Sequence, residues 1–220
     1  MESNTNIIIV DDHALFREGM KLLIEKEGMG KVIAEADNGK TFLTMLKKHK
    51  PDLVIMDIEM PLMGGLEATA KAIDIFPDLK VLVLTMLNEK ENYSEMINAG
   101  VMGFVLKTAG KKELETAIQT VLRGESYFSS TLLHQIIIEA SKQKVILDHP
   151  IIHEHDISKR ELEVLQLMSD GLSTTEIAEK LFRSKKTIEM HRNRLQEKTN
   201  TKNIIQLVIY GLKNNLAHLR

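Results

Sequence analysis

The sequence of 220 residues contains no cysteine, so disulfide bonds and metal sites built on thiolates are excluded. It also lacks any apolar run near the roughly 20 residues that a membrane-spanning helix needs. The first six residues have neither the basic region nor the long apolar core of a secretory signal. Low-complexity segments and short-period repeats are absent as well. These absences indicate a cytoplasmic protein without a membrane partner.

The composition is that of a soluble globular protein, with 43% apolar and 27% charged residues, but the charge is unevenly distributed. Ser158 to Arg220 contain 12 Lys and Arg against 7 Asp and Glu, whereas the residues before them contain 17 against 24. An acidic first part and a basic last part predict two domains with different partners. We expect these domains at residues 1–125 and 158–220, joined by a partly helical linker at 126–157.

The run Leu53 to Met56 consists of four apolar residues and leads directly into Asp57. A short apolar run bounded by turn signals is typical of a strand that is buried on both faces of a parallel sheet. Asp57 would then lie at the carboxyl end of the strand, where open α/β sheets bind their ligands. The alternative is that Asp57 caps the helix that follows, and this stretch alone does not decide between the two interpretations.

Five apolar strands alternate with five amphipathic segments over the first 125 or so residues, which predicts a doubly wound α/β sheet. The strands are expected at Ile7–Val10, Val32–Ala36, Leu53–Asp57, Val81–Thr85 and Met102–Leu106. Four of them end in polar residues that can bind a ligand or react. The first ends in Asp11 and Asp12, and the third, fourth and fifth end in Asp57, Thr85 and Lys107, respectively. Because the carboxyl ends of parallel strands share one edge, three carboxylates, a hydroxyl and an ammonium should surround one cleft.

Each of these residues has an ordinary structural alternative, because a single Thr or Lys at a strand end is usually solvated and an acidic pair often caps a helix. The four strand ends together favour phosphoryl transfer to a carboxylate. Clustered carboxylates repel one another unless a cation neutralises them, and oxygen ligands with no cysteine or histidine favour Mg²⁺. A carboxylate can then attack the phosphoryl group while the cation and the ammonium stabilise its charge.

In order, spacing and residue type, these positions resemble the receiver domain of two-component response regulators, which has a flavodoxin-like five-stranded fold. The resemblance implies that a sensor histidine kinase phosphorylates Asp57. It implies that Mg²⁺ is bound by Asp57, by Asp12 directly, by Asp11 through water and by the backbone carbonyl of Glu59. Lys107 would pair with the phosphoryl group, Thr85 would sense it, and Phe104 would be the aromatic switch. Most receivers have a proline directly after this lysine, where the present sequence has Thr108.

The expected linker contains two features of its own. Ser129 and Ser130 could cap a helix that runs to about Lys144. His149, His153 and His155 then follow within seven residues, a spacing that permits either a metal site or a solvated linker.

The last 63 residues show only helical patterns, and four helices are expected. Ser158 and Glu161 form a capping box for the first. Thr174 or Thr175 should cap the second, Ser184 the third, and Asn203 should open the fourth. The second and third helices, joined by a short link, suit a helix-turn-helix.

The third helix region is basic, with six Lys and Arg against two acids between Arg183 and Lys198. A basic helix is often only a solvated face. However, residues 158–212 resemble the all-α, four-helix DNA-binding domain of NarL/FixJ-type (LuxR-type) regulators. The matching residues are Glu161, Val164, Leu165, Gly171, Leu172, Glu176, Ile177, Ala178, Leu181, Ser184, Thr187, Ile188, His191 and Lys198. This resemblance implies that the third helix is a recognition helix.

On that helix, Ile188 and Leu195 should face the core, and the outward residues should contact DNA. Base edges are expected to be read by Glu189, Met190 and Asn193. Phosphates are expected to be bound by Lys185, Lys186, Thr187, His191, Arg192 and Arg194. Glu189 and Thr199 depart from the family pattern, in which these positions are usually basic and apolar, respectively.

The final helix carries more apolar residues than one side of a small helical domain needs, so a homodimer contact is expected at Ile205, Val208, Ile209 and Leu212. The combined interpretation is a phosphorylation-controlled, DNA-binding transcription regulator rather than an enzyme. Two alternatives remain: a phosphate-hydrolysing enzyme that uses Asp11, Asp12 and Asp57, and an adaptor that works without phosphate and without DNA.

Overall fold

The computed structural model describes residues 5–86, 93–128, 157–201 and 203–218. The chain forms two compact units, Met1–Phe128 and Ser129–Arg220, which are described separately below. The expected linker helix and the three linker histidines lie outside the described residues. No helix within the described ranges is both long and apolar enough to cross a bilayer.

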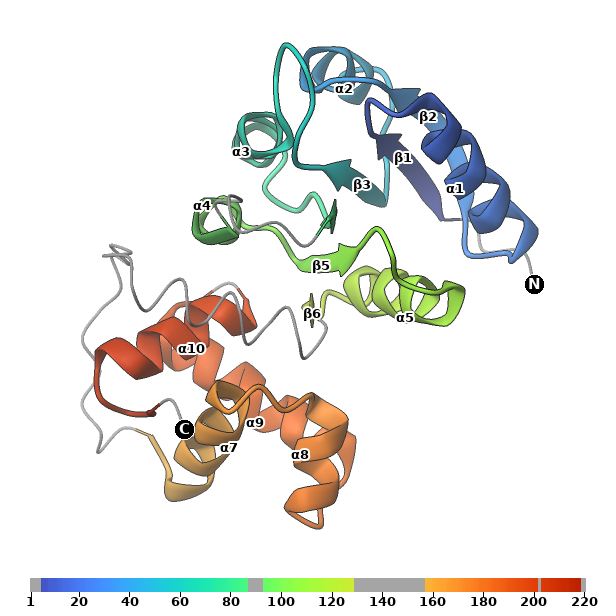
Figure 1. Cartoon of the computed structure of the whole chain (residues 1–220). Coiled ribbons are helices and arrows are strands. Elements are labelled where there is room, and N and C mark those ends of the chain that lie inside the picture. Colours follow the sequence, from blue (N-terminus) through green and yellow to red (C-terminus); the bar gives the residue numbers. More distant parts are fainter. Residues whose placement is uncertain (1–4, 87–92, 129–156, 202, 219–220) are drawn as a thin grey trace. The chain divides into compact units, whose positions relative to one another are not determined.

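The first unit is a parallel sheet in the order β2-β1-β3-β4-β5-β6 (Figure 1). Its strands are β1 (Asn6–Val10), β2 (Lys31–Ala36), β3 (Leu53–Asp57), β4 (Val81–Thr85), β5 (Gly103–Leu106) and β6 (Tyr127–Phe128). Its helices are α1 (Ala14–Lys26), α2 (Gly39–Leu46), α3 (Gly65–Ile75), α4 (Tyr93–Asn98) and α5 (Lys111–Leu122). The doubly wound α/β fold is therefore confirmed. The short strand β6 was not expected and adds a sixth member to the sheet.

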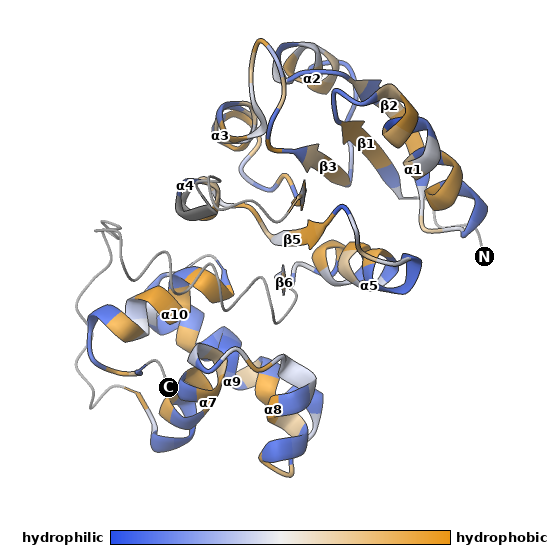
Figure 2. Cartoon of the chain, in the orientation of Figure 1, coloured by the Kyte–Doolittle hydropathy of each residue, from blue (hydrophilic) through white to orange (hydrophobic). Residues whose placement is uncertain are grey.

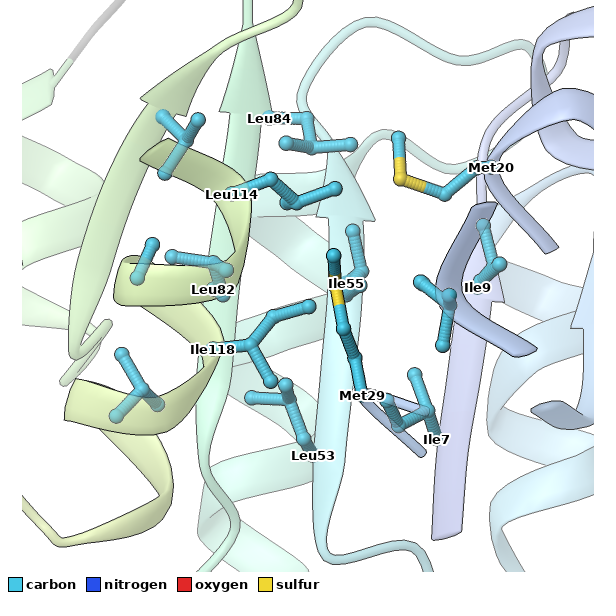
Figure 3. Packing of buried hydrophobic residues seen from close by; sticks show 14 of the residues in the cluster. Ile7, Ile9, Met20, Met29, Leu53, Ile55, Leu82, Leu84, Leu114 and Ile118 are labelled. Atoms are coloured by element: carbon cyan, nitrogen blue, oxygen red, sulfur yellow. The ribbon is translucent and has the colours of Figure 1, made fainter. Parts of the chain in front are cut away.

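The sheet is the core of this unit, because β3 and β4 are buried at every position and β1 at four of its five. On one face, alternate strand residues such as Ile55 and Leu82 pack against α1 and α5, in particular against Met20 and Ile118 (Figure 3). The strands β1, β3 and β5 are accordingly among the most hydrophobic segments of the chain (Figure 2). Burial on both faces explains why these strands appear in the sequence as continuous apolar runs.

Strand β6 pairs in parallel with β5, with Gly103 opposite Tyr127 and Phe104 opposite Phe128. A Cβ atom on Gly103 would lie 2.7 Å from the carbonyl oxygen of Tyr127, so the missing side chain is what lets the two strands approach. The rings of Phe104 and Phe128 are 5.7 Å apart between centroids. The last strand therefore covers the fully buried Phe104.

The second unit contains α7 (Lys159–Ser169), α8 (Thr174–Lys180), α9 (Lys185–Thr199) and α10 (Ile204–Lys213). Ser158 and Glu161 form the expected capping box, and Ser184 and Asn203 cap α9 and α10 as expected. The predicted cap of α8 was wrong: Ser173, rather than Thr174 or Thr175, accepts the N–H of Glu176 and forms a second capping box. Serine fits both boxes because its hydroxyl reaches the third backbone N–H of the helix.

Ile188 and Leu195 are fully buried, as expected for the inner face of α9. Thr199, the residue that departs from the family pattern, is buried too. Its hydroxyl donates to the carbonyl of Leu195 at 2.7 Å and lies 2.9 Å from the hydroxyl of Thr201. A polar residue is tolerated in this apolar position because its hydrogen bonds are made within the unit.

Candidate functional site

The polar strand ends meet at the carboxyl edge of the sheet, because β1, β3, β4 and β5 are consecutive neighbours in it. Asp11 follows β1, Asp57 ends β3, Thr85 ends β4 and Lys107 follows β5. Beside them lies a cleft of about 570 Å³ whose lining includes Asp12, Asp57, Glu59 and Lys107. The predicted convergence of these residues on one edge is what the structure shows.

Lys107 connects the two buried acids. Its Nζ lies 2.8 Å from Asp11 Oδ2 and 2.8 Å from Asp57 Oδ2, and 5.1 Å from the centre of the Phe16 ring. The second oxygen of Asp57, Oδ1, accepts the backbone N–H of Ile58 at 2.9 Å. The turn after Lys107, where Thr108 replaces the usual proline, is closed by the N–H of Ala109, which donates to the carbonyl of Leu106.

Burial and charge act in opposite directions on Asp57. Burial disfavours the carboxylate and raises its pKa above the ordinary value of 3.8, and the hydrogen bond and charge of Lys107 offset this only in part. For Lys107, burial lowers the pKa, but the carboxylates of Asp11 and Asp57 together outweigh burial and leave the pKa raised. The ammonium is therefore held in its charged form beside an acid that burial has made more basic.

The acids offer a set of donors for a divalent cation. One potential ligand atom from each of Asp11, Asp12, His13 and Asp57 lies within 4.8 Å of all the others. Asp11 Oδ2 is buried and makes no hydrogen bond of regular geometry among the described residues, although Lys107 lies near it. A buried carboxylate oxygen in this position fits a cation site, since oxygen donors are what Mg²⁺ requires.

Two of the predicted residues contact groups other than the acids. The hydroxyl of Thr85 is buried and donates to the carbonyl of Met86 at 2.9 Å. Phe104 is buried against Phe128.

Two further residues belong to the surroundings of Asp57. Behind Asp57, a Cβ atom on Gly65 would lie 2.0 Å from the Asp57 carbonyl oxygen, so only glycine allows α3 to begin there. Sequence analysis did not assign His13 to the site, although the adjacent Asp11-Asp12-His13 run was a usable signal.

On α9, the predicted DNA-contacting residues divide by exposure. Exposed are Lys185, Lys186, Met190, Asn193 and Arg194, and partly exposed are Thr187, Glu189 and His191. Arg192 was wrongly grouped with the exposed residues: it is only 5% exposed, and its guanidinium donates to Asn193 Oδ1. The reason is helical geometry, since a residue four positions after the buried Ile188 lies on the same side of the helix.

An ion pair between the buried Glu161 and the exposed Lys198 fixes the position of α9. Glu161 accepts Lys198 Nζ at 2.7 Å and also accepts the backbone N–H and hydroxyl of Ser158. Burial alone would raise the pKa of Glu161, but these hydrogen bonds lower it. Glu161 thus joins the start of α7 to the end of α9, a role that sequence analysis had not assigned to it.

The proposed dimer residues on α10 are less accessible than expected. Ile205, Val208 and Ile209 are buried within the single chain, and Leu212 is partly buried. The expectation of an open apolar face at the first three residues was wrong, because their side chains are already removed from solvent.

A parallel sheet whose carboxyl edge holds three acids and a lysine, in a chain that also carries a helix-turn-helix, defines a response regulator. Residues 7–119 match the response regulator receiver domain, and residues 155–211 match the bacterial regulatory proteins of the luxR family. The chain belongs to the response regulators that combine these two domains.

Among similar proteins is the transcriptional regulatory protein DegU of Brevibacillus brevis, 33% identical over 100% of this chain and 98% of that protein. The oxygen regulatory protein NreC of Staphylococcus carnosus is 36% identical over 96% and 98% of the two chains. A structure of RcsB from Salmonella enterica serovar Typhimurium, bound to the promoter rprA with the phosphomimetic BeF3-, is also similar. It is 29% identical, with a TM-score of 0.54 over 94% of this chain and 98% of that one. A structure of two RcsB dimers on two parallel DNAs is 28% identical, with a TM-score of 0.56 over 96% and 99% of the chains.

The raised pKa of Asp57 predicts that Asp57→Asn increases the free energy of unfolding at neutral pH. A carboxyl whose pKa is raised by folding stabilises the fold only while it is protonated, so the ionised group costs stability at pH 7. The gain should exceed the scatter of roughly 0.5 kcal/mol that is usual for surface substitutions. It should shrink as the pH falls through the raised pKa towards the ordinary value of 3.8, because the wild-type carboxyl is then neutral too.

Urea unfolding of the full chain at several pH values measures this difference. The matched control is Asp74→Asn, which neutralises an exposed acid on α3 of the same unit. An equal gain in both variants, or a gain for Asp57→Asn that grows towards low pH, would contradict the assignment.

Proposed function

We propose that this protein is a phosphorylation-dependent transcription regulator that accepts a phosphoryl group from a histidine kinase on Asp57 and binds DNA as a dimer. The observation that carries the proposal is the placement of Lys107 within 2.8 Å of both Asp11 and Asp57 at the edge of an acidic cleft. Support comes from RcsB, which was solved on promoter DNA with a phosphomimetic. The domain ranges given above are part of this proposal, with the end of the first domain moved from residue 125 to Phe128, where the first compact unit ends.

In this proposal, Asp57 is the nucleophile. One of its carboxylate oxygens attacks the phosphorus of the donor, and the bond from phosphorus to the leaving group breaks. Lys107 then releases one of its two carboxylate partners and pairs with the phosphoryl oxygens, whose charge it stabilises.

The cation would be Mg²⁺, held by Asp11, Asp12, Asp57 and the backbone carbonyl of Glu59. When bound, it neutralises the carboxylates and lowers the repulsion that an anionic donor meets. After transfer, the hydroxyl of Thr85 would leave the carbonyl of Met86 and bond a phosphoryl oxygen, and Phe104 would respond to that movement. Thr85 and Phe104 are therefore proposed as the switch that reports phosphorylation.

The phosphorylation step has a direct test. Acetyl phosphate should label the full chain with one phosphoryl group per molecule, and only when Mg²⁺ is present, because the acids otherwise repel the donor. Asp57→Asn should abolish labelling, while the matched variant Asp74→Asn should be labelled like wild type. Mass spectrometry of the intact protein gives the stoichiometry.

The same experiment separates the regulator from a phosphate-hydrolysing enzyme. A regulator reaches stoichiometric labelling of Asp57, whereas an enzyme would release inorganic phosphate in steady turnover without a lasting label. Full labelling of Asp57→Asn would show that another residue is the acceptor.

The exposed face of α9 is proposed to enter the major groove. Lys185, Lys186, Thr187, His191 and Arg194 would contact phosphates, and Glu189, Met190 and Asn193 would face base edges. Arg192 is no longer included, because it is buried. Phosphate contacts supply affinity for any sequence, whereas base contacts supply discrimination.

This division predicts different effects for two substitutions. Lys186→Ala should weaken binding to all DNA alike and lower the salt slope by about one, because a phosphate contact is lost. Asn193→Ala should instead lose discrimination at one base pair, on the order of 1–3 kcal/mol, with a nearly constant slope. Salt titrations against cognate and scrambled DNA measure both, with Lys159→Ala, an exposed lysine on α7, as the control. Equal weakening on both DNAs by Asn193→Ala would show that the helix is oriented differently.

The dimer is proposed to form through α10, as part of the same function. Because Ile205, Val208 and Ile209 are buried, a charge there would threaten the fold itself, so Leu212 is the residue to change. Leu212→Asp should weaken pairing on DNA that carries two half-sites, because a charge would enter an apolar contact. Asn215→Asp adds the same charge at a nearby exposed position and should leave pairing as it is. Sedimentation of the complexes measures pairing, and an equal loss in both variants would place the interface elsewhere.

A further inference from the structure

The side chain of His13 lies among the acids of the proposed phosphorylation site, although it is not among the cation ligands named above. Its Nδ1 is 2.8 Å from Asp12 Oδ1 and 3.2 Å from Asp11 Oδ1. The backbone N–H of the same residue also donates to Asp11 Oδ1 at 2.8 Å. His13 therefore contacts one acid through its backbone and two through its ring.

These distances match the spacing of neighbouring ligands around one ion. In an octahedral site with metal–ligand distances of about 2.1 Å, adjacent ligand atoms lie about 3 Å apart. The ring nitrogen of His13 stands at this spacing from two oxygens that belong to different acids. Asp11 is 1% exposed and its other oxygen, Oδ2, pairs with the Lys107 ammonium at 2.8 Å, so Oδ1 is the oxygen that faces His13.

The position of His13 at the start of α1 leaves its imidazole ring free to change orientation. His13 is the N-cap residue of α1, and its side chain makes no capping hydrogen bond to the helix. The side chain is 70% exposed, so the ring can turn slightly from hydrogen bonding to ligation without disturbing the core. Replacing His13 should therefore leave the fold intact.

We propose that His13 is a nitrogen ligand of the cation at Asp11, Asp12 and Asp57, and that it makes this site favour first-row transition cations over Mg²⁺. Imidazole suits transition cations, whereas Mg²⁺ prefers oxygen donors and keeps its water. The site then binds Mg²⁺ through oxygens alone and binds Co²⁺ through oxygens and one nitrogen. The inference rests on the cation site of the proposed function and adds a selectivity to it.

The test compares the binding of Co²⁺ and Mg²⁺ alone, by calorimetry on the full chain at one fixed pH. His13→Ala should weaken Co²⁺ binding by at least about tenfold, the loss already common when a group that only supports a metal ligand is removed. Mg²⁺ binding should fall by a much smaller factor. His13→Asn, which offers oxygen in place of the ring nitrogen, should show the same loss of Co²⁺ binding. The control is His49→Ala, which removes an imidazole before β3, at the opposite edge of the sheet.

Spectroscopy distinguishes ligation from an indirect effect. Electron spin echo measurements with Co²⁺ should show coupling to a histidine nitrogen in the wild type and in His49→Ala, and none in the two His13 variants. If His13→Ala weakens Co²⁺ and Mg²⁺ by the same factor and the nitrogen coupling is absent from the wild type, His13 only positions the acids and the proposal is overturned. If the wild type binds neither cation, the proposed function fails together with it.

Discussion

The ammonium of Lys107, placed between Asp11 and Asp57, is the interaction on which the arrangement of the first unit depends. Both acids are almost fully buried, and a buried carboxylate without a partner is costly. The lysine reaches them from the end of β5, while the acids come from the ends of β1 and β3. One cation thus holds three strand ends together. Removing Lys107 would leave both acids uncompensated, and breaking a buried pair in this way typically costs about 3–5 kcal/mol.

The same interaction allows the site to accept a further anion. Lys107 is shared by two acids, so it can exchange one of them for a new anion without losing all its partners.

The second unit also contains a lysine that pairs with a buried acid, and there the pair positions a helix. There, Lys198 pairs with the buried Glu161 and fixes the end of α9, while Lys185 and Lys186 at its start form no ion pair with an acid among the described residues. A buried charge positions the helix, and exposed charges are left for a ligand.

Sequence patterns were sufficient for the architecture and for most of the site. The strands were found because burial on both faces requires continuous apolar runs, and their polar ends were brought together by topology alone. Patterns did not show that Arg192 is buried. A basic residue is expected at the surface, although Arg192 lies on the same side of α9 as the buried Ile188. They also missed β6, because two residues leave no periodic signal. The contact of His13 with two acids depends on side-chain direction, which no spacing rule provides.

The ring of Phe128 has a practical consequence for where the first domain ends. The sequence pattern ended the domain at residue 125, yet Phe104 is covered by Phe128, three residues later. We therefore place the end of the folded receiver after Phe128. A receiver isolated by cutting at residue 125 would uncover one side of the Phe104 ring and remove the outermost strand. Any difference between such a fragment and the whole protein would then report the damaged edge of the sheet rather than the absence of the second unit.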